Sequence, residues 1–454
     1  AGSHGLDGIT TDNNTTLQIN SSGGISRTDN GTSTVGNLVL SQAGSSSGVS
    51  FGVDNMSLTV GGTAQFGGDN ITLNSANLDF QGTPSFDNSS SLSVISGEFI
   101  LQSGVTINDS SLDFTSSTFK PSGTVSLTGS SHFMFDSGSS VMLEGDSTLS
   151  QSGSVTWPSP DLNGNALTLN VDNMTIDGAQ SIGTGESLSS GSSNLYLNDN
   201  LTIDNGGILS SDNGSVTLNK GLVLNDGELR QGGGILNLIG GGTVGSTGRL
   251  DVSNSELKLG SALSFVGTLV VDNGTSWSGL GGTVDLSAGT LESGGGTFNL
   301  DDFTIGANST FRLSGDTEIS SASDLTLGNL ELNGNTLSLE FASVGDSAFI
   351  LPNILTMDNV GSVIETRGSN LTLANALQIN LGSITSTGGT LSFAGGLTLA
   401  PYGSIDVTDS TLSVSQVLDL SLIHISEPTR PLYSSYDVFS LKKKSWGGGG
   451  GGGG

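Results

Sequence analysis

Asp199-Asn200-Leu201-Thr202-Ile203 is the clearest copy of a five-residue phrase on which the fold of this chain depends. Its last three residues alternate apolar, hydroxyl and apolar side chains, which is the period-two pattern of a strand with one buried face. Its first two residues favour a turn, because Asp and Asn side chains bond to nearby backbone and tolerate left-handed geometry. Related copies occupy residues 54–58, 69–73 and 172–176. The phrase predicts short strands that alternate with tight turns.

The same apolar, polar, apolar triplet continues along the chain outside these four copies. It recurs at residues 58–60, 216–218, 298–300, 371–373 and 397–399. The chain has 71 glycines and is rich in Ser and Asn, which resembles a flexible linker, but the sustained alternation favours a folded chain. No window shows a lasting 3.6-residue period, and helix-forming residues are scarce. We therefore predict an all-β protein.

The length and spacing of the predicted strands distinguish between two all-β architectures. The strands span about three to five residues and return roughly every six to ten, which gives roughly forty in one chain. A sandwich or barrel would need several domains to hold so many, and no composition shift marks domain boundaries. A coil of three strands and three turns needs about 20 to 25 residues, and coils stacked ~4.8 Å apart form a rod of roughly 80 to 100 Å. We predict one parallel β-helix (β-solenoid) over residues 1–419.

The final segment, residues 420–454, differs from the rest in character. Residues 420–430 resemble the in-frame translation of a transposase sequencing adapter, and residues 434–441 resemble that of a flow-cell primer. Lys442 to Lys444 then match an A-tract, and the eight glycines from Gly447 to Gly454 match a run of G. We interpret residues 420–454 as a non-native, disordered, adapter-derived tail. The β-helix stalk of residues 1–419 is accordingly expected to be truncated.

Charge and composition exclude some functions. The chain has 12 basic and 42 acidic residues and a formal net charge of −30. A field of this sign repels nucleic-acid phosphate, so we expect no nucleic-acid partner. Only 12% of the residues are charged, about half the usual share, so Ser, Thr, Asn and Gly must cover most of the surface. Cysteine is absent, which excludes thiolate metal sites, and no stretch approaches the ~20 apolar residues of a membrane span.

Residues 201–207 and 389–399, each a strand triplet joined to Gly-rich turns, carry a likeness to a known class of proteins. The chain resembles bacterial surface or secreted parallel β-helix proteins, similar to autotransporter passengers and filamentous-haemagglutinin-like adhesins. The resemblance implies an extracellular or bacterial outer-surface location and non-catalytic adhesive or scaffolding work. The implied partners are a host or neighbouring cell surface, or a glycan.

The alternative is a secreted polysaccharide-cleaving enzyme of the pectin-lyase-like β-helix type, either a lyase or a glycosidase. Such enzymes cluster carboxylates on one face for general acid and base roles. The adjacent pair Asp301-Asp302 is the candidate, but the Gly-His-Gly and Arg-Ile-Lys elements of polygalacturonase-like enzymes do not follow it. A lyase also needs basic side chains, and only Arg312 and Arg367 lie between Lys258 and residue 420. We interpret Asp301 and Asp302 as turn residues, and we assign no catalytic and no cofactor-binding residue.

Metal and surface-array sites are equally sparse in the sequence. His4 and His132 are the only histidines before residue 420, and His132 is expected on an exposed strand face. Calcium is the ion that best suits the many Asp-rich turns. The calcium-binding nonapeptide, however, is matched only in part and at one place, Gly67-Gly68-Asp69-Asn70. No metal ligand can therefore be named. Outward threonines suggest an ice-binding-type array, but β-propensity explains them better; they are Thr59, Thr72, Thr175 and Thr202.

Overall fold

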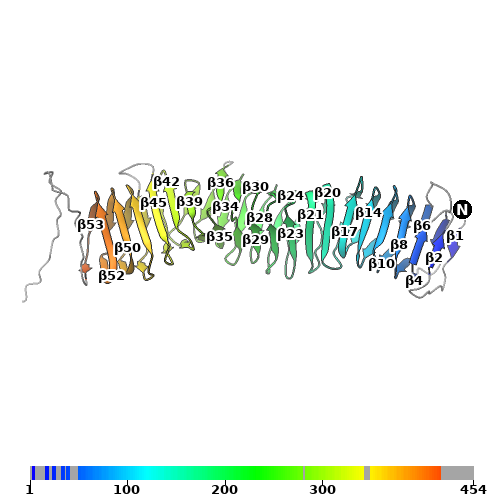
Figure 1. The fold of residues 1–454 in the computed structure, drawn as a ribbon, viewed down its shortest axis with the longest axis horizontal. Coiled ribbons are helices and arrows are strands. Elements are labelled where there is room, and N and C mark those ends of the chain that lie inside the picture. Colours follow the sequence, from blue (N-terminus) through cyan, green and yellow to red (C-terminus); the bar gives the residue numbers. More distant parts are fainter. Residues whose placement is uncertain are drawn as a thin grey trace, which may run out of the picture.

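The chain folds into a straight rod of stacked coils (Figure 1). The computed structural model describes residues 50–279, 282–341 and 348–420, and the strand segments 3–5, 16–19, 23–26, 32–35 and 37–40. These residues form strands and turns and no helix, and the strands stack in parallel as a β-solenoid of about 17 turns. At ~4.8 Å per turn the rod is about 80 Å long. The predicted parallel β-helix is confirmed. The predicted tail, residues 420–454, lies outside the described residues except for Leu420, which ends the last strand and does not begin a disordered tail.

Each coil of the N-terminal part contains three strands. Apart from the first strand, which pairs with the third, each strand pairs with the strand three further along. One run of stacked strands consists of β1 (Ser3–Gly5), β3 (Gly23–Ser26), β6 (Ser50–Asp54), β9 (Asn70–Asn74), β12 (Ser91–Ile95), β15 (Ser111–Thr115) and β18 (His132–Phe135). A second run consists of β4 (Thr32–Val35), β7 (Ser57–Val60), β10 (Asn77–Phe80), β13 (Glu98–Leu101), β16 (Thr118–Lys120) and β19 (Ser140–Val141). The third run consists of β2 (Thr16–Ile19), β5 (Asn37–Leu40), β8 (Ala64–Gly67), β11 (Pro84–Asp87), β14 (Gly104–Asn108) and β17 (Gly123–Thr128).

In the middle of the rod, β20 (Ser147–Pro158) and β21 (Ala166–Asp177) pass through a corner without a break, and two runs continue from the two ends of β21. One consists of β23 (Ser187–Gly191), β26 (Ile208–Ser211), β29 (Glu228–Gln231), β32 (Arg249–Asp251), β35 (Thr268–Val271), β38 (Thr290–Ser293), β41 (Thr310–Leu313) and β44 (Asn329–Glu331). The other consists of β24 (Asn194–Leu197), β27 (Val216–Leu218), β30 (Ile235–Leu238), β33 (Glu256–Leu259) and β36 (Ser276–Gly279). The remaining run consists of β22 (Gln180–Ile182), β25 (Leu201–Ile203), β28 (Leu222–Leu224), β31 (Gly242–Val244), β34 (Leu263–Phe265), β37 (Val284–Leu286) and β40 (Phe303–Ile305).

The C-terminal part repeats the arrangement with two runs and one added strand. The longer run consists of β39 (Gly296–Asn299), β42 (Thr317–Ser321), β45 (Thr336–Phe341), β48 (Val363–Arg367), β50 (Leu377–Thr387), β52 (Leu397–Thr408) and β54 (Leu418–Leu420). The shorter run consists of β43 (Leu325–Thr326), β46 (Ala348–Leu351), β49 (Asn370–Leu373), β51 (Thr390–Phe393) and β53 (Thr411–Val414). The added strand, β47 (Leu355–Met357), pairs with the first part of β50.

The register places like side chains above one another. Leu58 pairs with Leu78, which pairs in turn with Phe99, and all three are buried. Because side chains alternate between the two faces of a strand, every second residue joins one continuous interior column. Phenylalanines fill the N-terminal interior, where the Phe66 and Phe86 rings stack at 4.6 Å between centroids. One core therefore runs along the rod.

The turn prediction holds for some copies of the five-residue phrase and fails for one. Asn55 adopts a left-handed φ of 52° at a corner, and Ser75, Ser96 and Ser116 repeat that geometry on later coils. The backbone amides of Asn55, Ser75 and Ser96 donate to carbonyls of the next coil. Asp172-Asn173, by contrast, lies inside β21, so predicting a turn there was wrong. The reason is that β20 and β21 cross this corner as continuous strands, with a register shift after Gln151.

Buried hydroxyl groups satisfy the backbone where a corner turns inward. Ser90 is 1% exposed, and its Oγ donates to the carbonyl of Phe66 at 3.0 Å and accepts from the amide of Asp69 at 3.1 Å. Asn side chains form ladders on the outside, where Asn219 Nδ2 donates to Asn198 Oδ1 at 2.8 Å. Asn198 Nδ2 in turn donates to Asp177 Oδ1. Each link joins residues one coil apart, so these side chains reinforce the stacking of coils.

Two corners of the rod share the same sequence and the same hydrogen bonds. Asn163-Gly164-Asn165 and Asn333-Gly334-Asn335 each follow a buried Leu, and the first Asn of each has a φ of 51°. Asn163 Nδ2 donates to the Leu143 carbonyl at 3.0 Å, and Asn333 Nδ2 donates to the Leu313 carbonyl at 3.1 Å. The third residue of each motif donates to the preceding Leu carbonyl at 3.1 Å. The motif is thus a corner staple that the chain uses twice.

Replacing Phe99 tests the aromatic core. Phe99 is fully buried and contacts the rings of Phe80, Phe86, Phe114 and Phe119. Phe99→Ala should lower the free energy of unfolding by about 3 to 5 kcal/mol, because the cavity cannot collapse between paired coils. Urea unfolding followed by circular dichroism measures this. The control, Ile95→Ala at a side chain 37% exposed, should change stability by no more than about 0.5 kcal/mol.

Replacing Asn335 tests the corner staple. Its Nδ2 donates to the carbonyls of Leu332 at 3.1 Å and Leu313 at 3.3 Å, and alanine leaves these carbonyls without that donor. Because the Leu332 carbonyl keeps the Asn335 amide and the Leu313 carbonyl keeps Asn333 Nδ2, Asn335→Ala should cost about 0.5 to 1.5 kcal/mol, and Asn165→Ala a similar amount. Equal unfolding midpoints for the wild type and both variants would contradict a structural role for the motif.

Candidate functional site

The adjacent carboxylates Asp301 and Asp302 form the turn between β39 and β40, as the sequence interpretation proposed. Asp301 Oδ1 accepts hydrogen bonds from the Ala322 amide at 2.7 Å and from Ser321 Oγ at 3.2 Å. The Ala322 hydrogen bond, with those of Asn299 and Ser321, outweighs partial burial and holds the pKa of Asp301 below its ordinary value. This carboxylate therefore ties two neighbouring coils together.

The histidine and calcium candidates fall on separate parts of the rod. His132 begins β18 and is exposed, with Nδ1 3.3 Å from the Ser130 carbonyl, as expected for a strand-face residue. His4 falls within β1. Asp69 is 1% exposed, and its Oδ2 accepts from the Gly67 amide at 2.8 Å. Across the described ranges, no three His, Asp or Glu side chains are grouped as a metal would require. Calcium binding stays a prediction without a ligand set.

The outward threonines do not build a common array. Thr59 lies on β7 and Thr72 on β9, which belong to different runs of stacked strands. Thr175 on β21 stacks with Tyr196, and Thr202 on β25 stacks with Val223. This placement agrees with the preferred interpretation, in which β-branched residues suit the pleated surface.

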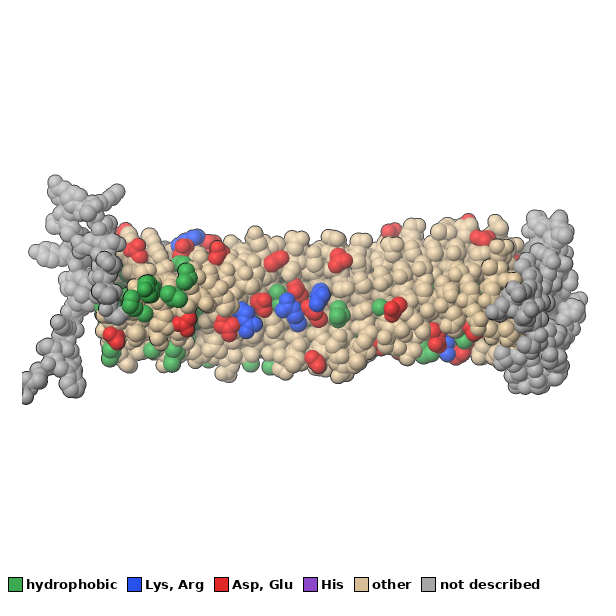
Figure 2. All heavy atoms as spheres, turned by 60° about the horizontal axis from the view of Figure 1, so that its bottom comes forward, with side chains coloured by type: hydrophobic (Ala, Val, Ile, Leu, Met, Phe, Trp, Pro, Cys, Tyr) green, Lys and Arg blue, Asp and Glu red, His purple; other side chains and the backbone are tan. Residues whose placement is uncertain are grey.

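A row of alternating charges crosses the middle of the rod and forms the first candidate surface (Figure 2). Arg249 reaches Glu228 on the previous coil at 3.1 Å, Asp251 on its own coil at 3.1 Å and Glu292 two coils further on at 3.9 Å. Arg312 continues the row, with Glu292 at 3.8 Å and Glu331 at 2.7 Å. Each cation in this row is matched by carboxylates. The arrangement binds successive coils to one another and offers little free charge to a ligand.

Ion pairs within the row shift the pKa values of Glu228 and Arg230. Burial by itself would raise the pKa of Glu228, but the hydrogen bonds and charges of Arg230 and Arg249 outweigh burial, so its pKa lies below the ordinary value. The Glu228 hydrogen bond, together with nearby carboxylates, raises the pKa of Arg230. The ionised form of Glu228 is thus favoured by folding.

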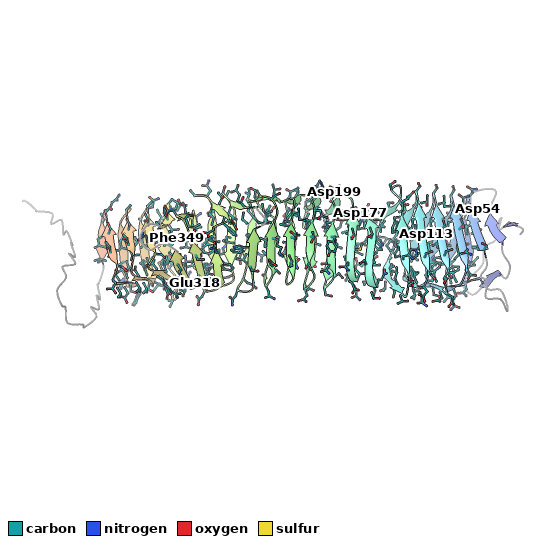
Figure 3. All side chains as sticks on the ribbon, turned by 90° about the horizontal axis from the view of Figure 1, so that it is seen from above. Asp54, Asp113, Asp177, Asp199, Glu318 and Phe349 are labelled. Atoms are coloured by element: carbon teal, nitrogen blue, oxygen red, sulfur yellow. The ribbon has the colours of Figure 1, made fainter. Side chains whose placement is uncertain are left out.

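The second candidate is a hollow of about 630 Å³ near the C-terminal end of the rod. Its floor is the outer face of β39, β42, β45 and β48, and the glycines Gly294 to Gly296 leave one side without side chains. Gly295 and Gly296 have φ values of 110° and 112°, which other residues rarely adopt. Arg367 Nη1 lies 2.8 Å from Glu318 and Nη2 lies 2.9 Å from Glu365. Figure 3 shows Glu318 far from Asp54 and Asp113 along the rod.

The strand register assembles this hollow from distant parts of the sequence. Glu318 on β42 pairs with Ser338 on β45, which pairs with Glu365 on β48. Ser338 is only 6% exposed and donates to Glu365 Oε2 at 3.1 Å. The Glu365 hydrogen bond, together with the surrounding carboxylates, outweighs burial and raises the pKa of Arg367. The hollow therefore holds a fixed cation between two carboxylates.

Sequence reasoning named Arg367 only as an isolated basic residue and missed its two acidic partners. Glu365 and Arg367 are two positions apart on one strand, so period two places them on the same face. That signal was visible. Glu318 was not predictable in the same way, because its position beside Glu365 depends on the register of two intervening strand pairings.

Comparisons with known proteins identify no relative of this chain. No protein-family model matches the sequence, and neither the curated proteins nor the solved structures contain a significant match.

Glu228 provides a test of the charged row through pH. A carboxyl with a lowered folded pKa contributes stability above its unfolded value, near 4.5, and that contribution is lost as the pH falls through the folded pKa. Glu228→Gln should therefore lower the melting temperature at pH 7, and its gap to the wild type should close as the pH falls below 4.5 and through the folded pKa. Thermal unfolding at several pH values measures the gap. Asp302→Asn is the control, and a constant gap for Glu228→Gln at all pH values would contradict the linkage.

Proposed function

We propose that this protein is a non-catalytic structural or adhesive β-solenoid that acts outside the cell or on a bacterial outer surface. The observation that carries the proposal is the single rod, in which one core continues through successive coils (Figure 1). Each coil of a solenoid contacts only its neighbours, so the length of the rod grows in proportion to the length of the sequence. A rod of this kind suits work as a spacer or an extended contact surface.

The surface chemistry supports an extracellular role. Most of the visible outer surface consists of uncharged polar side chains and backbone (Figure 2). The formal charge of −30 keeps such rods apart in solution and favours solubility. The absence of cysteine suits an oxidising exterior, where unpaired thiols would cross-link. Within the described residues, no helix has the length and apolar character needed to cross a membrane.

The proposed partners are a host or neighbouring cell surface, or a glycan on it. Nucleic acid is disfavoured by charge. Ser, Thr, Asn and Asp side chains along successive coils provide repeated hydrogen-bonding groups at a spacing of ~4.8 Å, which suits contact with an extended polar surface. The rod thus supplies many weak contacts, which add up through multivalency.

A polysaccharide-cleaving enzyme of the pectin-lyase-like type is the second candidate, and the hollow near Arg367 is the observation that favours it. The hollow places Glu318 and Glu365 together with a cation, the groups that such chemistry requires. Each carboxylate is tied through its Oε2 atom to Arg367, however, at 2.8 Å for Glu318 and 2.9 Å for Glu365. We therefore rank binding above cleavage.

Attachment and turnover distinguish these two candidates. The full chain should bind immobilised polysaccharides or intact cells and release neither reducing ends nor unsaturated products. A binding assay with washed cells, followed by reducing-sugar and ultraviolet absorbance assays on the supernatant, makes this comparison. Boiled protein is the matched control. Product formation that depends on Glu318 or Glu365 would reject the non-catalytic proposal and favour the enzyme.

A further inference from the structure

The hollow around Arg367 has unused hydrogen-bonding capacity. Arg367 and Ser338 contact only Oε2 of Glu365, and Arg367 contacts only Oε2 of Glu318. Within the described part of the chain, the Oε1 atoms of both carboxylates have no hydrogen-bond partner. The side chains of Glu318 and Glu365 are 27% and 34% exposed. Two partly exposed carboxylates therefore keep acceptor capacity on either side of one guanidinium.

The backbone around the hollow has a counterpart elsewhere in the rod. Gly296 donates to the Asp316 carbonyl at 3.0 Å, and Gly123 donates to the Asp146 carbonyl at 2.9 Å. Asp316 Oδ1 accepts from the Thr336 amide at 2.7 Å, and Asp146 Oδ1 accepts from the Ala166 amide at 2.9 Å. The two corner staples, residues 163–165 and 333–335, complete the match. The same local frame is thus built twice.

Only one of the two frames carries charged side chains on its outer column. In the first frame, Thr124, Thr148, Thr168 and Ser189 stack in register. In the second, the stacked residues are Thr297, Glu318, Ser338 and Glu365. The residue that follows buried Ser190 is Gly191, whereas the residue that follows buried Thr366 is Arg367. Because the outer column of the first frame carries only hydroxyl groups, stacking of coils does not require Glu318, Glu365 or Arg367.

We infer that the hollow is a binding site for a neutral, hydroxyl-rich carbohydrate chain. Vicinal hydroxyl groups would donate to the open Oε1 atoms, while remaining guanidinium N–H groups would donate to sugar oxygens. Hydrogen bonds to charged groups are stronger than those between neutral groups. A volume of about 630 Å³ lies within the range of small-ligand sites. The inference rests on the proposed function and specifies the ligand class for this one site.

The charges in the hollow disfavour the other ligand classes. Asp316, Glu318 and Glu365 outnumber Arg367, so a uronate or another anionic chain meets net repulsion. A divalent cation would need the position between the two carboxylates, which the Arg367 guanidinium already fills at 2.8 Å and 2.9 Å. A neutral sugar adds to the open oxygens without displacing Arg367.

A triple substitution that copies the first frame tests the site. Glu318→Thr/Glu365→Ser/Arg367→Gly should retain the far-UV circular dichroism spectrum and weaken binding of neutral oligosaccharides at least about tenfold. Titration calorimetry with gluco-, xylo-, manno- and galacto-oligosaccharides provides the Kd. Thr148→Ala/Thr168→Ala in the first frame is the matched control and should leave the Kd unchanged. If the triple variant fails to fold, Glu318→Gln/Glu365→Gln decides the question in the same assay.

Three results would overturn the inference. The wild type could bind none of the neutral oligosaccharides at millimolar concentration, the hollow variants could bind them as tightly as the wild type, or oligogalacturonide or CaCl₂ could be the ligand lost on substitution. Where one of these results is found while the wild type and the triple variant still attach to cells, this site is rejected and the proposed function stands. Product release by the wild type would reject the proposed function itself.

Discussion

The hydrogen-bonded ladder between successive coils is the interaction on which the rest of this structure depends. A single coil closes few backbone hydrogen bonds within itself, because its strands face different directions and pair only with the coils before and after. Peptide groups at paired strand positions are therefore satisfied by residues about one coil away. This constraint fixes the register, and the register in turn places each inward side chain on top of a similar one, as with Leu58, Leu78 and Phe99.

The corners are where the ladder is most difficult to maintain, and polar side chains resolve the difficulty. Ser90 inside the rod and Asn165 and Asn335 at its corners add side-chain hydrogen bonds to backbone carbonyls at the turns. Left-handed residues such as Ser96 are strained, but the amide of Ser96 donates to the next coil at 3.0 Å. Charged residues on the outside also link successive coils, since Arg249 forms ion pairs with carboxylates from three coils. Stability is thus distributed over many contacts between neighbours.

Period two in the sequence was sufficient to predict the class of fold, because apolar alternation at triplets such as 201–203 directly reports one buried face. The local geometry at corners was harder to predict. Asp172-Asn173 looks like a turn and lies in a continuous strand, while Ser75 and Ser96 look ordinary and adopt left-handed turns. The difference arises from the neighbouring coil, which supplies or withholds the partner for each amide. The candidate site was less predictable still, because Glu318 and Glu365 meet only through a register that no local pattern encodes.

The repeated frame shows how such a scaffold separates stability from recognition. Inward positions and corner staples are constrained on both copies by burial and by backbone carbonyls, so Asn165 and Asn335 make the same bonds. Outward positions between corners are constrained only by β-propensity and by the solubility of the rod. A threonine column and a Glu-Ser-Glu column therefore fit the same backbone. Chemistry can thus be added to one stretch of the solenoid without altering the ladder beneath it, as the charged hollow on the second copy of the frame illustrates.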